Sequence, residues 1–151
     1  MSKKNTVYIA SDHAGFELKE KITQELPSWE WVDLGPGSKD RVDYPDFAEK
    51  LCQKVLTENN KGVLICASGI GMSITANKFD GIRAAHVENA KSAKLTREHN
   101  DSNVLCIGAL FLETQVAKEI IQTWLNTEFS EETRHQNRIN KITAIEKGKK
   151  S

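Results

Sequence analysis

The strongest chemical signal in the sequence is a cysteine followed closely by two glycines. Cys66 lies at the end of an apolar run, and Gly69 and Gly71 follow it just before a predicted helix. Glycines let the chain turn tightly and aim successive backbone N–H groups at one anion, and the helix adds its positive end. The same position can make a thiol a competent base or nucleophile. The alternatives are a tight turn without a ligand and an inert, buried cysteine.

This glycine loop does not match the common nucleotide-binding motifs. A P-loop would need a lysine after its second glycine, and a dinucleotide fingerprint would need a third glycine where Ile74 stands. The loop therefore favours a small anion or a developing oxyanion as its ligand.

Further polar residues stand next to predicted strands. Asp12 and His13 follow the first strand, and His99 and Asn100 precede the last one. Ligands of open α/β sheets bind beyond the carboxyl ends of the strands, so we expect these groups to converge with Cys66. The structural alternatives are that Asp12 caps the first helix and that His99 and Asn100 end a helix, with Asn100 as a left-handed cap.

Two arginines lie four residues apart near the end of the chain. Arg134 and Arg138 would occupy one face of a helix, where their guanidinium groups could clamp one phosphate. Alternatively they are solvated, or paired with Glu131 and Glu132.

The composition excludes several classes of protein. The chain has 151 residues, with 21 Lys and Arg against 21 Asp and Glu and a pI near 6.9, so no large basic field is available for nucleic acid or an anionic membrane. The longest apolar run, residues 63–67, is far shorter than the roughly 20 residues that cross a bilayer. Three cysteines without metal-ligand spacing argue against disulfides and zinc. We expect a cytoplasmic protein with reduced thiols and a single domain over residues 1–151.

Strand and helix patterns alternate along the chain. Strands are predicted over residues 6–10, 29–34, 63–67, 82–87 and 104–107, and amphipathic helices separate them. This alternation predicts a three-layer α/β/α sandwich with a five-stranded parallel, Rossmann-like sheet. A C-terminal helix is predicted from residue 131 to about 147, followed by a charged tail over 147–151 that frays.

Six ordered blocks of residues resemble those of one known family. They are residues 11–15 (SDHAG), 43–45 (DYP), 66–73 (CASGIGMS), 76–78 (ANK) with 81–84 (GIRA), 99–101 (HND) and 134–138 (RHQNR). Together they closely resemble the type B ribose-5-phosphate isomerases, a family that also includes galactose- and allose-phosphate isomerases. The resemblance implies interconversion of D-ribose 5-phosphate and D-ribulose 5-phosphate through a cis-enediolate, in the non-oxidative pentose phosphate pathway, with no metal or organic cofactor.

The resemblance also implies a role for each site residue. Cys66 would move the proton between C1 and C2, and Ser68 would act on the substrate oxygens. Asp12 and His99 would open the sugar ring. The remaining roles are an oxyanion hole from the N–H groups of Gly69, Ile70, Gly71, Met72 and Ser73, positioning of sugar oxygens by Tyr44 and Asn100, and phosphate binding by His13, Arg134 and Arg138. Such enzymes are homodimers or homotetramers with the site at the subunit interface, where His99 and Asn100 reach the Cys66 loop of the partner.

Three positions depart from the family pattern. Leu110 stands where many members carry a phosphate-binding arginine, and Ser68 stands where many have threonine. One branch replaces the cysteine with a loop glutamate, but Met72 here cannot act as a base, which agrees with Cys66 in that role. Because of Leu110 two alternatives stay open. One is an isomerase of a six-carbon sugar phosphate (allose or galactose 6-phosphate), and the other is a non-catalytic module that binds a sugar phosphate or nucleotide.

Overall fold

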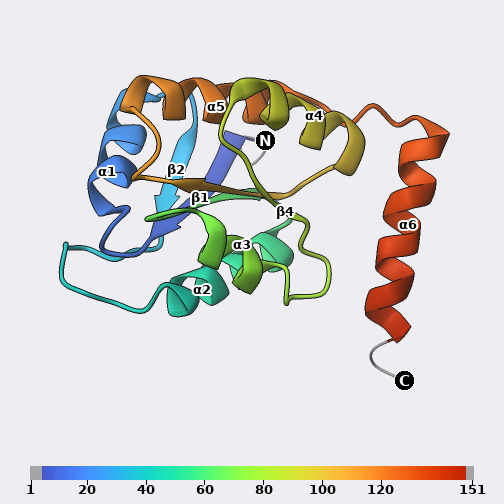
Figure 1. Cartoon of the computed structure of the whole chain (residues 1–151), viewed down its shortest axis with the longest axis horizontal. Helices are drawn as coiled ribbons and strands as arrows, with labels where there is room; N and C mark the ends of the chain where they lie inside the picture. The colour runs from blue at the N-terminus through green and yellow to red at the C-terminus, as the bar shows by residue number, and fades with distance from the viewer. Residues whose placement is uncertain (1–4, 149–151) are drawn as a thin grey trace.

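A five-stranded parallel sheet with helices on both faces forms the body of the protein (Figure 1). The computed structural model describes residues 5–148. The strands are β1 (Thr6–Ser11), β2 (Glu30–Asp33), β3 (Lys61–Cys66), β4 (Ala84–His86) and β5 (Val104–Gly108), in the order β2-β1-β3-β5-β4. The helices are α1 (Phe16–Glu25), α2 (Tyr44–Glu58), α3 (Ile70–Ala76), α4 (Ala90–Asn100), α5 (Thr114–Asn126) and α6 (Thr133–Gly148). The predicted sandwich with a C-terminal helix is confirmed.

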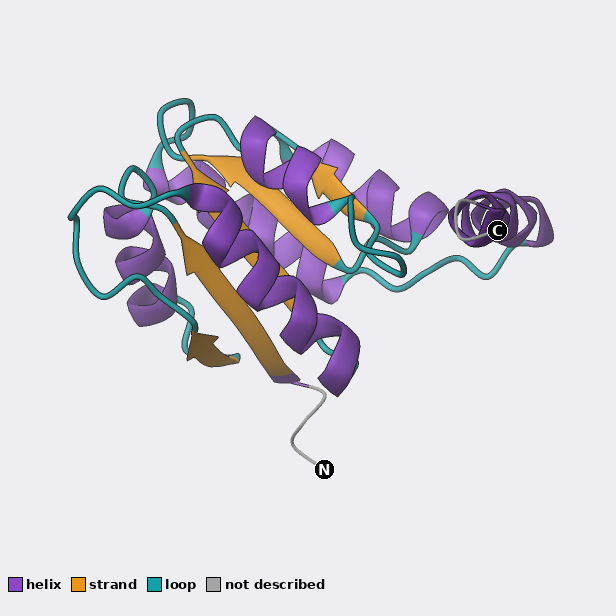
Figure 2. Cartoon of the chain, turned by 90° about the horizontal axis from the view of Figure 1, so that it is seen from below, coloured by secondary structure: helices purple, strands orange, loops and turns teal. Residues whose placement is uncertain are grey.

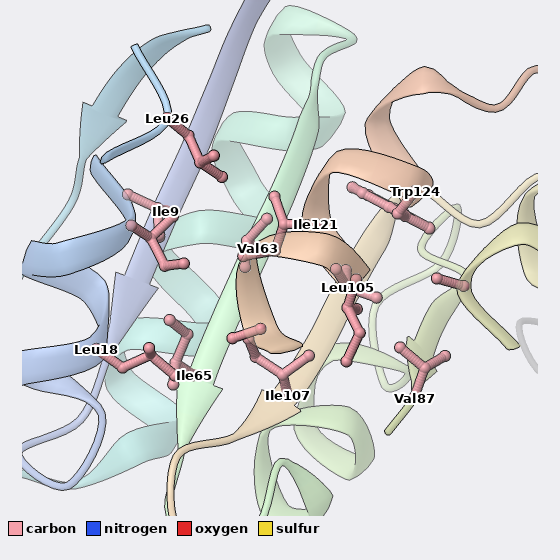
Figure 3. Close-up of a cluster of buried hydrophobic side chains, with 14 of the residues drawn as sticks. Ile9, Leu18, Leu26, Val63, Ile65, Val87, Leu105, Ile107, Ile121 and Trp124 are labelled. Atoms are coloured by element: carbon pink, nitrogen blue, oxygen red, sulfur yellow. The ribbon is translucent and has the colours of Figure 1, made fainter. Parts of the chain in front are cut away.

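The sheet separates two apolar cores. Side chains of α1, α4 and α5 pack on one face, and those of α2 and α3 pack on the other. Strand β3 contributes to both cores, because Val63 and Ile65 face the first core while Leu64 and Cys66 face the second. This explains its continuous apolar sequence, which is typical of a parallel strand covered on both faces. Figure 3 shows Val63 and Ile65 among side chains of the first core.

The chain reverses its direction of travel across the sheet at β1 and β3. It passes from β1 through α1 to β2 on one side, and returns through α2 to β3 on the other side. Ser11 pairs with Ile65, so the carboxyl ends of these two strands lie next to each other. Ligands of open α/β sheets bind at such a switch point. Asp12 and Cys66 therefore stand where the fold favours a site.

Several element boundaries differ from the predictions. The fourth strand has three residues instead of six, because the N–H groups of Ile82 and Arg83 bond to Phe79 and Asn103 outside the ladder. Helix α6 begins at Thr133 rather than residue 131, since Glu131 has a positive φ of 62°. Residues 147 and 148 still belong to α6, against the expected fraying there, and 149–151 lie outside the described residues.

Helix α6 stands apart from the sandwich in both views (Figures 1 and 2). It contacts the body at its two ends. His135 stacks on His99 with ring centroids 4.3 Å apart, and the Glu146 carboxylate accepts hydrogen bonds from the N–H of Gly81 at 3.2 and 3.3 Å. A cavity of about 450 Å³ separates α6 from the edge of the sheet, and the half-exposed Ile142 is among the residues that line it. No helix within residues 5–148 is long and apolar enough to cross a membrane.

Candidate active site

Cys66 ends β3 with its sulfur held by the loop that follows. The N–H of Gly69 donates a hydrogen bond to Cys66 Sγ at 3.1 Å, and the cysteine is 4% exposed. Gly69 has a φ of 81°, and a Cβ there would lie 2.9 Å from the carbonyl carbon of Ile107 and 2.8 Å from the His86 ring. Only glycine fits this position without strain. The loop thus places one amide donor against the sulfur and supports negative charge on it.

The other two cysteines belong to the core, as predicted. Burial raises the pKa of the Cys52 thiol to about 12. Burial also raises the pKa of Cys106 well above its ordinary value. Both residues are fully buried in the core beneath α2 and α3, and all three cysteines are free. Of the three, only Cys66 reaches the edge of the sheet where ligands bind.

The structure narrows the set of amides that could form an oxyanion hole. The Gly69 N–H is bonded to sulfur, the Ile70 N–H donates to Ser68 Oγ at 3.2 Å, and the Ser73 N–H donates to the Gly69 carbonyl at 3.1 Å. Gly71 and Met72 remain, in the first turn of α3, where an α-helix leaves its N–H groups without intrahelical partners. Of the five amides expected to form the hole, these two make no hydrogen bond within residues 5–148 and can bind a ligand.

Asp12 and His13 lie at the same edge of the sheet. The Asp12 N–H donates to the Ile65 carbonyl at 3.1 Å, which ties this residue to β3 beside Cys66. Its carboxylate accepts from the Gly15 N–H at 3.1 Å, so Asp12 closes the turn before α1 rather than capping the helix itself. His13 Nδ1 accepts a hydrogen bond from the Val42 N–H at 3.2 Å.

Tyr44, the first residue of α2, covers the loop from the other side. A Cβ on Gly71 would lie 2.5 Å from Tyr44 Cζ and 2.9 Å from its hydroxyl oxygen, so the ring packs directly on this glycine. The end of β5 closes the group, because the N–H groups of Ala109 and Leu110 donate to the carbonyls of Cys66 and Ala67 at 2.9 and 3.0 Å. The predicted site residues that the structure brings together here, called the first half of the candidate site, are Asp12, His13, Tyr44, Cys66, Ser68 and the loop over residues 69–73.

The expectation that His99 and Asn100 converge with Cys66 within one chain is wrong. Both residues end α4, which runs against the strands and delivers them to the amino end of β5. Gly62 pairs with Val104 at that end, whereas Cys66 pairs with Gly108 at the other. Four steps along a strand span about 13 Å, so the length of the sheet separates the two groups.

The paired arginines of α6 also belong to this distant group. The Ser130 N–H donates to the Glu98 carbonyl at 3.2 Å, which places the start of α6 beside the end of α4. Arg134 donates to the Glu132 carboxylate at 2.9 Å, as one structural alternative anticipated, and this hydrogen bond lowers the pKa of Glu132. Arg138 is exposed and makes no hydrogen bond or ion pair within the described residues. These four predicted site residues, called here the second half of the candidate site, are His99, Asn100, Arg134 and Arg138.

Two other arginines, to which the sequence pattern assigned no role, fix the position of this second half. Arg97 is 4% exposed, and it donates to the Asp101 carboxylate at 2.8 Å and to the Ser102 carbonyl at 2.7 Å. Arg83 donates to the Asn100 carbonyl at 2.9 Å. The left-handed residue after α4 is Asp101, with a φ of 47°, and not Asn100 as the capping alternative required. The sequence shows only an arginine, Arg97, near the end of a predicted helix, and its burial became apparent only in the structure.

The described residues offer acid–base groups and anion donors but no metal-binding cluster. Within residues 5–148, no group of three or more His, Cys, Asp or Glu side chains is placed to hold a metal ion. A thiol, a carboxylate and two free amides at a switch point are the components that proton transfer on a small oxygen-rich anion requires. The fold and the site thus define an α/β protein built for acid–base chemistry.

Comparison with known proteins identifies the family. Residues 7–142 match the profile of the Ribose/Galactose Isomerase family, and the chain belongs to this family. Ribose-5-phosphate isomerase B of Escherichia coli (strain K12) is 44% identical over 89% of this chain and 92% of its own. A putative sugar phosphate isomerase of Bacillus subtilis (strain 168) is 45% identical over 93% and 96% of the two chains.

Solved structures agree with the sequence relatives. The ribose-5-phosphate isomerase B of Clostridium thermocellum superimposes with a TM-score of 0.91 at 41% identity, covering 95% of this chain and 98% of that one. The enzyme of Mycoplasma genitalium, solved with bound ribulose-5-phosphate, has a TM-score of 0.89 at 39% identity, covering 94% and 96% of the two chains. The chain therefore shares its fold with an enzyme, that of Mycoplasma genitalium, whose structure contains a bound sugar phosphate.

Proposed function

We propose that this protein is an aldose–ketose isomerase that interconverts D-ribose 5-phosphate and D-ribulose 5-phosphate, a step of the non-oxidative pentose phosphate pathway. The observation that carries this proposal is the contact between Cys66 Sγ and the Gly69 amide at the switch point, beside Asp12 and the free amides of Gly71 and Met72. Free thiols suit the reducing cytoplasm in which such a pathway runs.

The arrangement supports a proton transfer that balances without a cofactor. Asp12 and His99 of the partner subunit exchange protons with the ring and hydroxyl oxygens, which opens the furanose. Cys66, as thiolate, then takes the proton from C2. The electron pair left on C2 forms the C1–C2 double bond, and the C1 carbonyl oxygen takes the negative charge of the enediolate. The hydroxyl proton passes from the C2 oxygen to the C1 oxygen with Ser68 as relay, and Cys66 returns its proton to C1, so the C2 oxygen becomes the carbonyl of the ketose.

The loop stabilises the charge that appears on the substrate oxygens. The N–H groups of Gly71 and Met72 are the donors for the enediolate oxyanion, and a single such donor is typically worth about 2.7–4 kcal/mol. The Ser68 hydroxyl, which already accepts from Ile70, donates a hydrogen bond to the neighbouring substrate oxygen. Tyr44 and Asn100 position the sugar hydroxyls, and His13, Arg134 and Arg138 hold the phosphate.

The experiment that tests this function follows the C2 proton. Incubation of the protein with ribose 5-phosphate in deuterated water is expected to exchange that proton and to produce ribulose 5-phosphate. A protein that catalyses neither would be a binding module instead, and calorimetry would then show binding without turnover.

A second candidate substrate rests on Leu110. Its side chain is 72% exposed although its backbone N–H is tied to the Cys66 loop, so an apolar and uncharged group borders the site. This leaves room for a longer sugar such as allose or galactose 6-phosphate. Comparing kcat/KM for ribose, allose and galactose phosphates decides between the candidates, and we expect the ribose compound to be preferred.

The site is completed between two copies of the chain, in a homodimer or homotetramer. The two halves lie at opposite ends of the sheet, and α6 projects from the body with Ile142 and Ile145 44% and 67% exposed beside a cavity. A second copy bound there would bring its Cys66 loop to His99 and Arg138 and would cover the apolar side chains.

Mixing two inactive variants tests this sharing. Cys66→Ala disables the first half-site, and His99→Asn disables the second. In a mixed dimer one site carries both changes and the other site carries none. Random reassortment of equal amounts makes about half of the dimers mixed, so about a quarter of all sites are intact and about a quarter of the wild-type activity is expected to return. Cys66→Ala mixed with Asp12→Asn is the matched control, because both changes then fall in the same half and no site is restored. Activity that stays absent in both mixtures would show that the halves do not come from different chains.

A further inference from the structure

His13 reaches the site as a neutral hydrogen-bond donor. The Val42 N–H donates to His13 Nδ1 at 3.2 Å, so Nδ1 acts as the acceptor and the ring proton resides on Nε2. A ring held in this way offers one N–H to a phosphate oxygen but no positive charge. A phosphate bound beside His13 therefore needs its counter-charge from another group.

The arginines of the chain differ in whether they form hydrogen bonds or ion pairs within the chain. There are five, and Arg83, Arg97 and Arg134 bond to carbonyl or carboxylate oxygens of their own chain. Arg41 and Arg138 form neither a hydrogen bond nor an ion pair among the described residues. Arg138 belongs to the second half of the site, whereas Arg41 lies in the loop that leads to Tyr44.

Arg41 is close enough to His13 to bind the same anion. The Val42 nitrogen that contacts His13 is bonded to the carbonyl carbon of Arg41, which places the Arg41 Cα within about 6 Å of the imidazole. Arg41 is exposed, and neither neighbouring carboxylate, Asp40 nor Asp43, pairs with it. The hydrogen bond from Val42 to His13 also ties the backbone of this loop to the segment after β1. The free guanidinium thus belongs to a segment that is held beside His13.

We infer that Arg41 binds the substrate phosphate together with His13 and supplies positive charge from the same chain that carries Cys66. This inference rests on the proposed function and adds a specificity residue to it. A planar guanidinium can take two phosphate oxygens at once, while His13 Nε2 donates to one. Arg41 therefore favours phosphorylated over unphosphorylated sugars, and the phosphate is held from both subunits.

The test compares Arg41→Ala and Arg41→Lys with a control in the same loop. Arg41→Ala is expected to raise KM for ribose 5-phosphate about tenfold and to weaken inhibition by inorganic phosphate by the same factor, while kcat changes less than about twofold. Arg41→Lys keeps the charge but loses the bidentate geometry, so it falls between alanine and wild type. Lys39→Ala, which removes an exposed cation two residues away, is expected to match wild type. Turnover of unphosphorylated ribose, where measurable, is expected to be the same in all four proteins.

Two results would overturn the inference. One is an unchanged KM and an unchanged phosphate affinity in Arg41→Ala, and the other is an equal effect of Lys39→Ala. Calorimetry with inorganic phosphate measures binding without turnover. It therefore tests the role of Arg41 in phosphate binding separately from the proposed isomerase function. If the wild-type protein does not isomerise ribose 5-phosphate but Arg41→Ala still loses phosphate affinity, the proposed function fails and the phosphate site stands.

Discussion

The sulfur of Cys66 and the amide of Gly69 lie 3.1 Å apart, within a turn that only glycine can form. Because Gly69 has a positive φ and contacts the backbone of β5, the turn cannot shift without moving the strand end as well. The sulfur is therefore held in one orientation relative to the loop amides before any substrate arrives. Such pre-organisation is what a general base needs.

Replacing the thiol tests its assignment as the base. Cys66→Ala is expected to lower kcat by about 10²–10⁴, the usual contribution of a positioned base. Cys52→Ala is the matched control, because this thiol is buried in the same core with its pKa raised to about 12. Steady-state kinetics on both variants are the measurement. Full turnover in Cys66→Ala would assign the base to another residue.

The contact between Tyr44 and Gly71 predicts a second effect. Gly71→Ala would place a methyl group 2.5 Å from Tyr44 Cζ, so the tyrosine has to move away from the loop. Alanine normally stabilises a helix by about 1 kcal/mol relative to glycine, but overpacking of this kind costs about 1–3 kcal/mol. We expect kcat/KM to fall at least about tenfold and Tm not to rise.

Gly37 provides the control for this substitution. No heavy atom lies within 4 Å of a Cβ built there, so Gly37→Ala is expected to leave both kcat/KM and Tm close to wild type. Equal kinetics of the two alanine variants would mean that the Tyr44 ring does not take part in the site.

Adding charge at residue 110 tests how the phosphate is held. Leu110→Arg places a guanidinium on a 72% exposed side chain whose backbone is tied to Ala67. KM for ribose 5-phosphate is expected to fall about threefold to tenfold, with kcat and Tm unchanged. Phe111→Arg, one position further along and 62% exposed, controls for the added charge. A KM that stays constant, or falls equally in both variants, would remove Leu110 from the border of the phosphate site.

The stacked histidines predict a dependence of stability on pH. Burial lowers the pKa of His135, and the positive charges of His99, Arg134 and Arg138 add to this effect while Glu132 opposes it. Because the folded-state pKa lies below the ordinary value of 6.5, the unfolded chain binds the proton more readily. The contribution of His135 to stability is therefore complete above about pH 6.5 and is lost as the pH falls below it.

Denaturant unfolding at pH 7.5 and pH 5.5 measures this contribution. The wild-type free energy of unfolding is expected to decrease between these values, and His135→Gln is expected to show a smaller decrease. Glu132 does not interfere, because its lowered pKa places its own titration below this window. An equal decrease in both proteins would assign the pH dependence to other groups.

Much of the fold could be predicted from the pattern of apolar residues. The unbroken apolar run at residues 63–67 predicted a strand, and β3, which is covered on both faces, is that strand, although it spans Lys61–Cys66. The order of β4 and β5 could not be predicted, because periodicity reports which face is buried and not which strands are neighbours. The start of β4 could not be predicted either. Ile82 is apolar and buried like a strand residue, but it lies in a loop, and its N–H donates to the Phe79 carbonyl instead of a neighbouring strand.

The first half of the site could be predicted better than the second. Cys66, Asp12 and His13 directly follow strands, so the edge rule of parallel sheets places them correctly. His99 and Asn100 precede a strand, and the same rule places them at the opposite end. The expectation of convergence treated proximity to a strand as sufficient and ignored its direction. The contact of His13 with Val42 joins residues 29 positions apart, and no local pattern predicts it.

The separation of the two halves along the sheet has a consequence for how turnover responds to dilution. The two groups of proposed site residues lie at opposite ends of β5, so under the proposed function a single folded chain lacks a complete reaction centre. Under the proposed sharing, specific activity falls when the protein concentration is lowered below the dissociation constant of the dimer, and the loss reverses when the protein is concentrated again. Assembly is then itself a condition for the chemistry, and two copies of one sequence act as a single catalytic unit.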